Sequence, residues 1–198
     1  GFNAGPHALT SAGGYTYQYD ANGNMISGKN KTLEYDAENR LIQVNELGII
    51  TTFVYDGDGG RVKQSSPSGS TIYIGSLFEK DSDEKTRKHI FAGANRVVTV
   101  DSTGNKYFYH SDHLGSSNVI TDVSGNLVQY CEYTPYGTLA RNEGTDVVKH
   151  KFTGKELDST GLYFYGARYY DPTIGRFITA DTIVQAPYDP QSLNRYAY

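Results

Sequence analysis

The chain has 198 residues, with 18 Lys and Arg, 22 Asp and Glu, and a formal net charge of −4. Its basic residues are spread out, which excludes the clustered basic surface of nucleic-acid-binding proteins, and no apolar run is long enough for a transmembrane helix. The 18 Tyr, 8 Phe and 22 Gly, without Trp, are typical of strands joined by many turns. We therefore predict an all-β fold.

A repeated motif follows the Gly-rich first 14 residues. Tyr-Asp-Ala-Asn-Gly-Asn-Met at 19–25 is answered by Tyr-Asp-Ala-Glu-Asn-Arg-Leu at 35–41 and by Tyr-Asp-Gly-Asp-Gly-Gly-Arg-Val at 55–62. Alternating apolar residues flank each copy, so the unit is strand, tight turn, strand. In the turn, Asp can accept backbone N–H bonds, and Gly or Asn can adopt the left-handed backbone conformation.

A single hairpin of this kind cannot bury its apolar face, so successive hairpins must stack into one ribbon. Tyr19, Tyr35 and Tyr55 should then occupy equivalent positions, with their rings stacked in register. The fold predicted from the residues is a stack of antiparallel β-hairpins in which each unit is supported by its neighbours.

The middle of the chain continues the pattern. We expect strands at 71–78, 89–92 and 96–100, and we interpret the polar run 79–88 as a solvated hairpin loop, with a short helix as the alternative. The turn sequence of the first motif returns after residue 100 as Asp-Ser-Thr-Gly-Asn and Asp-Val-Ser-Gly-Asn, and no linker separates domains. Cys131 has no partner for an internal disulfide and should be a buried small apolar residue.

Residues 154–178 form the most specific stretch. Turn chemistry at 158–161 should lead into an aromatic strand from Leu162 to Tyr170, covered on both faces. Pro172 should stop this strand, because proline has no N–H for the ladder. Gly175 should make the next bend before another short strand.

These motifs occur in a distinctive order. The three Tyr-Asp hairpins are followed by Asp-His-Leu-Gly-Ser at 112–116, Tyr-Thr-Pro-Tyr-Gly at 133–137, Phe-Thr-Gly-Lys-Glu at 152–156 and Gly-Ala-Arg-Tyr-Tyr-Asp-Pro at 166–172. From about residue 13 to the end, the succession resembles the C-terminal part of Rhs (YD-repeat) proteins. It includes the repeat-associated core of that family.

The resemblance implies a β-ribbon that spirals as part of a hollow shell. Such shells enclose a C-terminal toxin in bacterial polymorphic toxins and insecticidal Tc complexes, and teneurins resemble the same design at animal cell surfaces. The resemblance divides the chain into YD-type hairpin repeats at 1–100 and an Rhs core segment at 101–198. The chain begins without Met and ends within the pattern, so we expect a fragment of a secreted or cell-surface bacterial protein. Its expected partners are the remaining repeats and the toxin or effector segment of the same polypeptide.

Related cores cut their own chain as aspartyl autoproteases, which makes Asp181 and Asp171 the candidate catalytic residues. Asp181 matches an aspartate that usually precedes proline, although Thr182 follows it here. Arg168 and Arg176 are candidate supporting residues, because a guanidinium can hold a carboxylate in a bidentate pair. The expected cut lies beyond Tyr198, so the fragment itself should be inactive.

Alternatives to these assignments remain open at this point. Each aspartate could be an ordinary turn residue, as we expect for Asp189, and the exposed tyrosines could instead serve a cell-surface adhesion or glycan-binding module. His110, Asp112 and His113 lack the spacing of a zinc signature, and polar packing at a turn fits them better. We expect no cofactor and no metal.

Overall fold

The computed structural model describes residues 5–183, 186 and 188–198, and in these residues the fold consists of β-strands and two short 3-10 turns. Fourteen strands form one sheet in strict sequence order. They are β3 (Gln18–Tyr19), β4 (Met25–Gly28), β5 (Lys31–Tyr35), β6 (Leu41–Glu46), β7 (Ile49–Tyr55), β8 (Arg61–Ser66), β9 (Gly69–Ile74), β10 (Phe78–Asp81), β11 (Thr86–Ala92), β12 (Asn95–Asp101), β13 (Lys106–Ser111), β14 (Ser117–Thr121), β15 (Leu127–Tyr133) and β16 (Leu139–Gly144). The predicted all-β ribbon of antiparallel hairpins is confirmed.

Two smaller sheets complete the architecture. A four-stranded sheet contains β17 (Glu156–Leu157), β18 (Tyr163–Phe164), β19 (Tyr169–Asp171) and β20 (Arg176–Phe177). The strands β1 (Ser11–Ala12) and β2 (Tyr15–Thr16) pair with each other. The 3-10 turns are η1 (Phe152–Gly154) and η2 (Pro190–Leu193).

The turn of each Tyr-Asp motif is closed by the aspartate. Oδ1 of Asp20 accepts hydrogen bonds from the backbone N–H groups of Asn22 and Asn24, at 2.9 and 2.8 Å, and Gly23 has a φ of 86°. The same pair of contacts recurs at Asp36, Asp56, Asp101, Asp112 and Asp122. One carboxylate thus satisfies two backbone donors at each hairpin end, as predicted.

The tyrosine of the motif ties each hairpin to the one before it. The hydroxyls of Tyr19, Tyr35 and Tyr55 donate to main-chain carbonyls 10, 10 and 14 residues earlier, at 3.1, 2.9 and 2.6 Å. Tyr133 repeats the contact 16 residues back, at 2.8 Å. The prediction that Tyr19, Tyr35 and Tyr55 occupy equivalent positions in successive hairpins is therefore confirmed. The expected stacking of one ring on the next is not among the ring pairs of the described residues, and Tyr19 instead meets Tyr196 edge-on at 5.6 Å.

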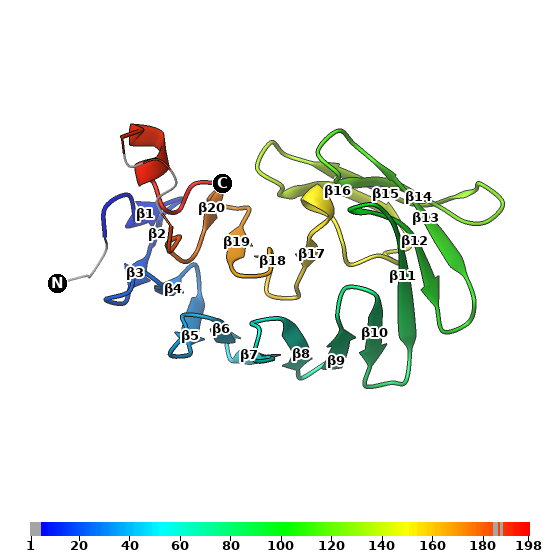
Figure 1. Cartoon of the computed structure of the whole chain (residues 1–198), viewed down its shortest axis with the longest axis horizontal. Coiled ribbons are helices and arrows are strands. Elements are labelled where there is room, and N and C mark those ends of the chain that lie inside the picture. Colours follow the sequence, from blue (N-terminus) through cyan, green and yellow to red (C-terminus); the bar gives the residue numbers. More distant parts are fainter. Residues whose placement is uncertain (1–4, 184–185, 187) are drawn as a thin grey trace.

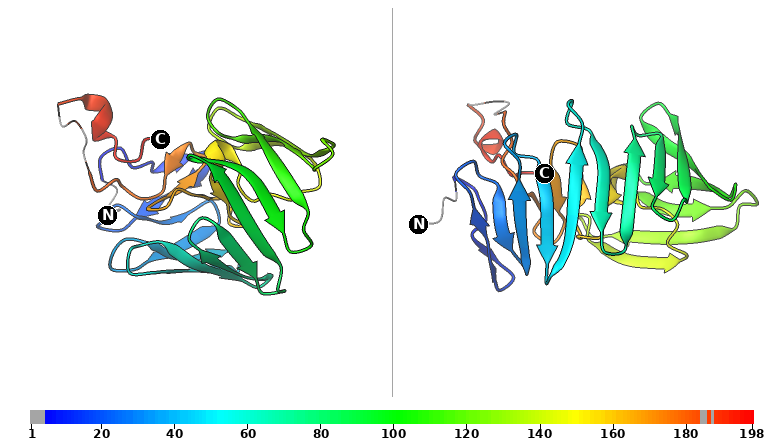
Figure 2. Two further views of the ribbon diagram at one scale, coloured as in Figure 1. Left: turned by 45° about the vertical axis from the view of Figure 1, so that its right-hand side comes forward. Right: turned by 90° about the horizontal axis from the view of Figure 1, so that it is seen from below.

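The long sheet curves around the four-stranded sheet, so that the C-terminal segment lies on its concave side (Figures 1 and 2). Side chains alternate between its faces: Phe53 is 3% exposed, whereas Val54 beside it is 51% exposed. Concave-side residues such as Leu33 and Phe53 share one core with Leu162 and Tyr169 of the C-terminal segment. Each layer buries the apolar face that the other could not bury alone.

The polar run 79–88 is a hairpin with an exposed turn, as expected, and not a helix, but its strands extend further into the run than a loop would allow. It contains the facing ends of β10 and β11, with Glu79 opposite Arg87, and the turn occupies residues 82–85. Glu79 and His89 are 3% and 6% exposed and lie 3.0 Å apart, Oε1 to Nε2. The run is not solvated throughout, because inward-facing positions of these strands carry charged side chains that satisfy one another.

The aromatic segment also differs in part from its prediction. The turn at 158–161 is confirmed, with the Gly161 N–H donating to the carbonyl of Asp158 at 2.9 Å. The single strand expected from Leu162 to Tyr170 is instead two strands, β18 and β19, because residues 165–168 form a turn. Both remain covered, and Tyr163 and Tyr170 are 0% exposed.

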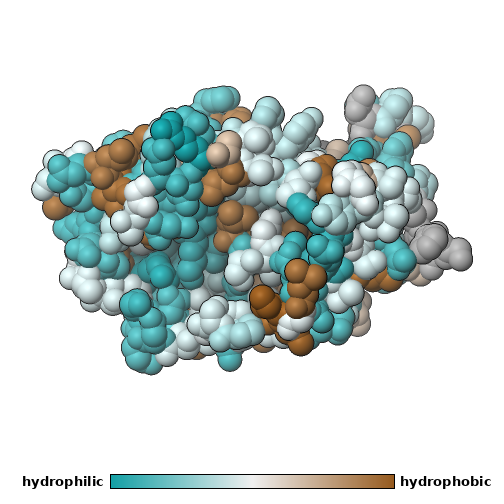
Figure 3. Space-filling model, turned by 180° about the vertical axis from the view of Figure 1, so that it is seen from behind, coloured by the Kyte–Doolittle hydropathy of each residue, from teal (hydrophilic) through white to brown (hydrophobic). Residues whose placement is uncertain are grey.

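The division into repeats at 1–100 and a core segment at 101–198 stays a prediction; β12 and β13, near residue 100, pair within the long sheet. Seen from behind, apolar surface residues gather in several separate patches among polar ones (Figure 3). Across the described residues, no helix has the length and apolar character needed to cross a membrane.

Candidate functional site

Asp171 lies at the end of β19, with 7% of its surface exposed. Its Oδ1 accepts hydrogen bonds from the backbone N–H and the hydroxyl of Thr173, at 2.8 and 2.6 Å. Arg176 is its cross-strand neighbour in β20, but the Arg176 guanidinium donates to the carbonyl of His7 at 3.0 Å. Asp171 thus has the geometry of a turn residue ahead of Pro172.

Asp181 has an arginine partner. Its Oδ2 lies 3.0 Å from Nη2 of Arg168, and its Oδ1 accepts from the N–H of Ile183 at 3.0 Å. The Arg168 guanidinium also stacks 3.8 Å from the ring centre of Phe177 and donates to the carbonyl of Arg195. A guanidinium pressed on a ring and shared between two acceptors holds the Asp181 carboxylate in one place.

The two aspartates are not neighbours in the hairpin. Asp171 pairs with Arg176 next to the turn that joins β19 and β20, whereas Ile178 pairs back toward Tyr169 and the chain then leaves the sheet toward Asp181. The register therefore puts the two carboxylates at opposite ends of the β19–β20 hairpin. Their catalytic roles, and those of the two arginines, stay predictions.

The residues first weighed as metal ligands have turn and strand contacts. Oδ1 of Asp112 accepts from the N–H groups of Leu114 and Ser116, and His110 Nε2 lies 3.0 Å from the hydroxyl of Thr121. Turn contacts account for Asp112, and a cross-strand contact between β13 and β14 accounts for His110. Cys131 is fully buried, as expected.

A buried ion cluster joins the long sheet to the C-terminal segment. Arg61, on β8, pairs with Glu156 through Nη2 and with Asp158 through Nη1, the latter at 2.8 Å. The hydroxyl of Tyr73 donates to the second oxygen of Glu156 at 2.8 Å. The Arg61 guanidinium also lies 4.2 Å from the ring centre of Phe164. Side-chain exposure is 1% for Arg61, 7% for Glu156 and 0% for Asp158.

One guanidinium faces two carboxylates in this cluster, and the pKa values of all three groups are shifted as a result. Burial raises the pKa of Glu156 to about 7, with Arg61 opposing the rise and Asp158 adding to it. Burial also raises the pKa of Asp158 against the opposing charge of Arg61. Although burial alone would lower it, the pKa of Arg61 is raised because both carboxylates favour its charged form.

A second polar cluster lies beside the first. Ligand atoms of Glu79, His89 and His150 lie within 4.8 Å of one another, and such a set could hold a metal ion. However, Oε2 of Glu79 is 3.2 Å from the Lys149 ammonium and 3.5 Å from the Arg87 guanidinium. Burial alone would raise the pKa of Glu79, but the hydrogen bond with His89 and the charge of Lys149 lower it. The carboxylate already has cationic partners, so the absence of a metal remains our prediction.

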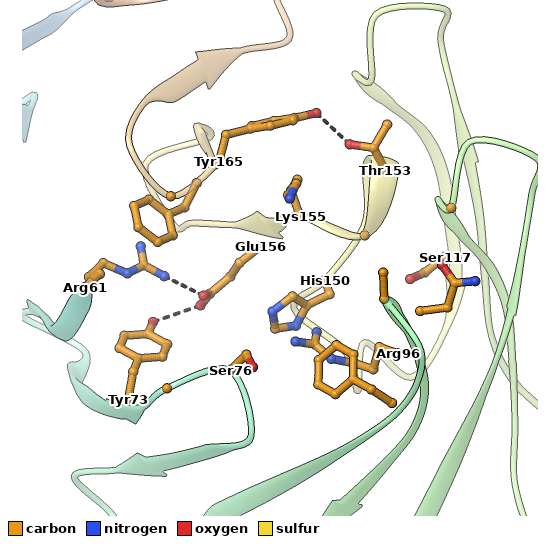
Figure 4. A pocket seen from close by; sticks show the side chains of 18 of the residues that line it. Arg61, Tyr73, Ser76, Arg96, Ser117, His150, Thr153, Lys155, Glu156 and Tyr165 are labelled. Atoms are coloured by element: carbon orange, nitrogen blue, oxygen red, sulfur yellow. Dashed lines mark hydrogen bonds and ion pairs between the residues drawn. The ribbon is translucent and has the colours of Figure 1, made fainter. Parts of the chain in front are cut away.

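Both clusters border a cavity of about 510 Å³ between the long sheet and the C-terminal segment. In the close view, Arg61, Tyr73 and Glu156 line one side and Arg96 and Ser117 the other (Figure 4). The wall therefore contains charged and hydrogen-bonding groups from β8, β9, β12, β14 and β17.

Sequence reasoning missed the ion cluster, although a signal was present. Arg61 stands six residues after the tyrosine of its motif, where Met25 and Leu41 stand in the first two copies, and both of these are buried. A charge at a core position of a repeat predicts buried partners of opposite sign. Those partners, Glu156 and Asp158, are more than 90 residues away, so only the folded chain identifies them.

Comparisons with known proteins agree with this architecture. The chain is 31% identical over 204 residues to the tRNA3(Ser)-specific nuclease WapA of Bacillus spizizenii, covering 96% of this chain and 9% of that protein. It is 29% identical to the toxin subunit YenC1 of Yersinia entomophaga, covering 84% of this chain and 16% of that protein. The crystal structure of TcdB2-TccC3-TEV superposes with a TM-score of 0.76 at 25% identity, over 90% of this chain and 10% of that one.

The chain thus spans about a tenth of the length of the WapA protein and of the solved structure that it matches. Its described strands form the curved hairpin ribbon expected of a YD-repeat shell. The family profile of the Teneurin YD-shell matches residues 7–198. The chain belongs to the Teneurin YD-shell family.

Proposed function

We propose that the chain is the part of a YD shell that encloses a C-terminal toxin or effector of the same polypeptide. The observation that carries this proposal is the curvature of the fourteen-stranded sheet around the C-terminal segment (Figure 1). The shell would continue through further repeats that pair with the sheet edges. The parent protein would be a secreted or cell-surface protein of a bacterium, as the toxin subunit among its relatives suggests.

The place of the chain end supports this proposal. The ring of Tyr198 lies 4.9 Å from that of Tyr170 and 6.3 Å from that of Phe177, within the aromatic cluster around β18–β20. Tyr196 is 2% exposed, and its hydroxyl donates to the carbonyl of Gly23 at 2.8 Å. A segment continuing from this anchored end would start on the concave side of the sheet.

Enclosure can be tested on the parent protein by limited proteolysis. An effector inside an intact shell should survive a protease that degrades the same effector when it is expressed alone. Partial denaturation of the shell should remove this protection. An effector that is cut equally fast in both contexts would refute enclosure.

The tyrosines favour the shell over the alternative of a glycan-binding adhesin. Stacking on sugars requires a strip of exposed rings. In the described part of the chain most tyrosines are buried or half-buried, and the exposed ones are Tyr15, Tyr136, Tyr188 and Tyr198. The motif tyrosines use their hydroxyls inside the ribbon instead.

Release of the effector by self-cleavage is the second part of the proposal. Asp181, held by Arg168, would act as the base that takes a proton from the attacking water. A second carboxyl would give a proton to the leaving amide nitrogen; the sequence names Asp171 for this role, but the register places it at the other end of the β19–β20 hairpin from Asp181. The mechanism needs one group in its acid form and the other in its base form, so the rate should have a bell-shaped pH dependence.

The cleavage test requires the parent protein extended beyond Tyr198, through the region where related cores are cut. We expect it to split, and we expect Asp181→Asn to abolish splitting while the fold is retained. Asp122→Asn is the matched control, because Asp122 also accepts a backbone N–H two residues on, at 2.8 Å. Splitting of Asp181→Asn at the wild-type rate would refute the role of Asp181, and Asp171→Asn tests the other candidate in the same way.

A further inference from the structure

The cavity beside the ion cluster contains an arginine without a counterion. Arg96, on β12, lines it; the guanidinium has a hydrogen bond with the Tyr109 side chain, but its Nε and Nη1 are out of contact with solvent and have no partner. Its guanidinium lies 5.2 Å from the ring centre of Phe91, and burial lowers the pKa of Arg96. Buried donors are nearly always paired, so this guanidinium has capacity for an acceptor that the chain does not supply.

The carboxylates of the cavity wall are already engaged. Glu79 contacts His89 and Lys149, and Glu156 contacts Arg61 and the Tyr73 hydroxyl. Both act on Arg96 only at a distance. The third, on Asp56, accepts two backbone N–H bonds of its own turn.

A second cation faces the same space. Lys155, just before β17, lines the cavity with its Nζ 5.3 Å from the ring centre of Tyr165, and among the described residues it forms no ion pair. His150 stands between Arg96 and Glu156 in the close view (Figure 4). Burial, and next the charge of Arg96, lower the pKa of His150 far below its usual range, so its ring stays neutral at physiological pH.

We propose that this cavity binds a carboxylate side chain of an acidic polypeptide segment, with Arg96 as the main contact and Lys155 as the second. The source of that segment rests on the proposed function: it is the polypeptide enclosed on the concave side of the sheet. A volume of about 510 Å³ accommodates one or two side chains. A carboxylate fits the planar guanidinium and adds one negative charge, whereas a phosphate dianion would meet the nearby Glu79 and Glu156.

The test is an NMR titration of the ¹⁵N-labelled chain with end-blocked peptides of four glutamates or four glutamines. The glutamate peptide should saturate the shifts of residues around the cavity, and the glutamine peptide should bind at least tenfold more weakly. Arg96→Gln should weaken glutamate binding about tenfold or more, in line with the loss of a charge-assisted hydrogen bond. Arg96→Lys should restore part of the loss, and Lys155→Gln should have a smaller effect.

Arg141→Gln is the control, because Arg141 has its own partners, Glu132 and Glu143, and none of these three residues lines the cavity. Equal binding of both peptides, or an unchanged affinity in folded Arg96→Gln, would refute the site. Tighter binding of inorganic phosphate than of the glutamate peptide would refute the carboxylate assignment. Proteolytic protection of the effector is independent of these titrations, so a failed titration with protection intact would reject the carboxylate site and leave enclosure standing.

Discussion

Replacing Arg61 by methionine gives the third repeat the residue found at the equivalent position of the first. The change would remove the only cation that contacts both Glu156 and Asp158 among the described residues. Leaving such buried charges unpaired costs about 3–5 kcal/mol. With a urea m-value of about 2 kcal/mol/M, the unfolding midpoint should fall by about 2 M.

The assay is urea unfolding of the chain followed by far-UV circular dichroism, since the sequence has no Trp for fluorescence. Adding Glu156→Gln and Asp158→Asn to Arg61→Met should recover most of the loss, because the triple variant buries neutral groups in place of charges. The loss in Arg61→Met should also shrink at about pH 4, where the unpaired carboxylates take up protons.

Arg40→Met is the matched control, because Arg40 is paired with Asp36 and Glu38 but is 24% exposed, and its loss should be far smaller. A loss below about 1 kcal/mol for Arg61→Met would show that the cluster does not hold the two layers together. The same conclusion would follow if the triple variant were no more stable than the single one.

Three further changes test the repeat, the ion cluster and a close contact. Tyr35→Phe removes a hydroxyl bond to the preceding hairpin and should lower the free energy of unfolding by about 1 kcal/mol; an unchanged urea midpoint would refute a stabilising role. The pKa of Glu156 is raised to about 7 in the folded chain. The stability that Glu156 contributes is therefore fully present below its pKa in the unfolded chain and is lost as pH rises through about 7. Thermal melts from pH 5 to 8 should therefore show a decline that Glu156→Gln reduces, and equal declines would contradict this. Gly137→Ala should lower the melting temperature more than Gly125→Ala. Both glycines have positive φ, but only at position 137 would the new Cβ come within 2.4 Å of the Phe152 ring. Equal losses of melting temperature would rule out the clash.

The sequence predicted the ribbon well because its information is local. Each Tyr-Asp motif contains the turn aspartate, the left-handed residue and the apolar flanks of one hairpin, so strand, turn and repeat follow from neighbouring residues. Layer contacts are different, since they join residues far apart in the chain. Arg61 carries a visible signal as a charge at a core position, but nothing near it specifies Glu156, and the polarity of 79–88 concealed the buried Glu79.

The candidate site could be predicted only as residue types at family positions. The sequence pointed to Asp171 and Asp181, and the fold gives them different surroundings, a turn for one and an arginine partner for the other. The two unsatisfied nitrogens of Arg96 could not be foreseen, because an arginine side chain is usually solvated. Its environment depends on the C-terminal segment closing over it.

The strict strand order of the long sheet has a kinetic consequence. Each of β3 to β16 pairs only with the strands next to it in sequence, so a hairpin can form as soon as its residues leave the ribosome, without waiting for distant partners. The bonds from Glu156 to Arg61 and from Tyr196 to Gly23 span 95 and 173 residues. They can form only after nearly the whole chain has been synthesised. Vectorial growth of the ribbon would therefore be followed by a late closing step, in which the C-terminal segment docks on an already formed wall.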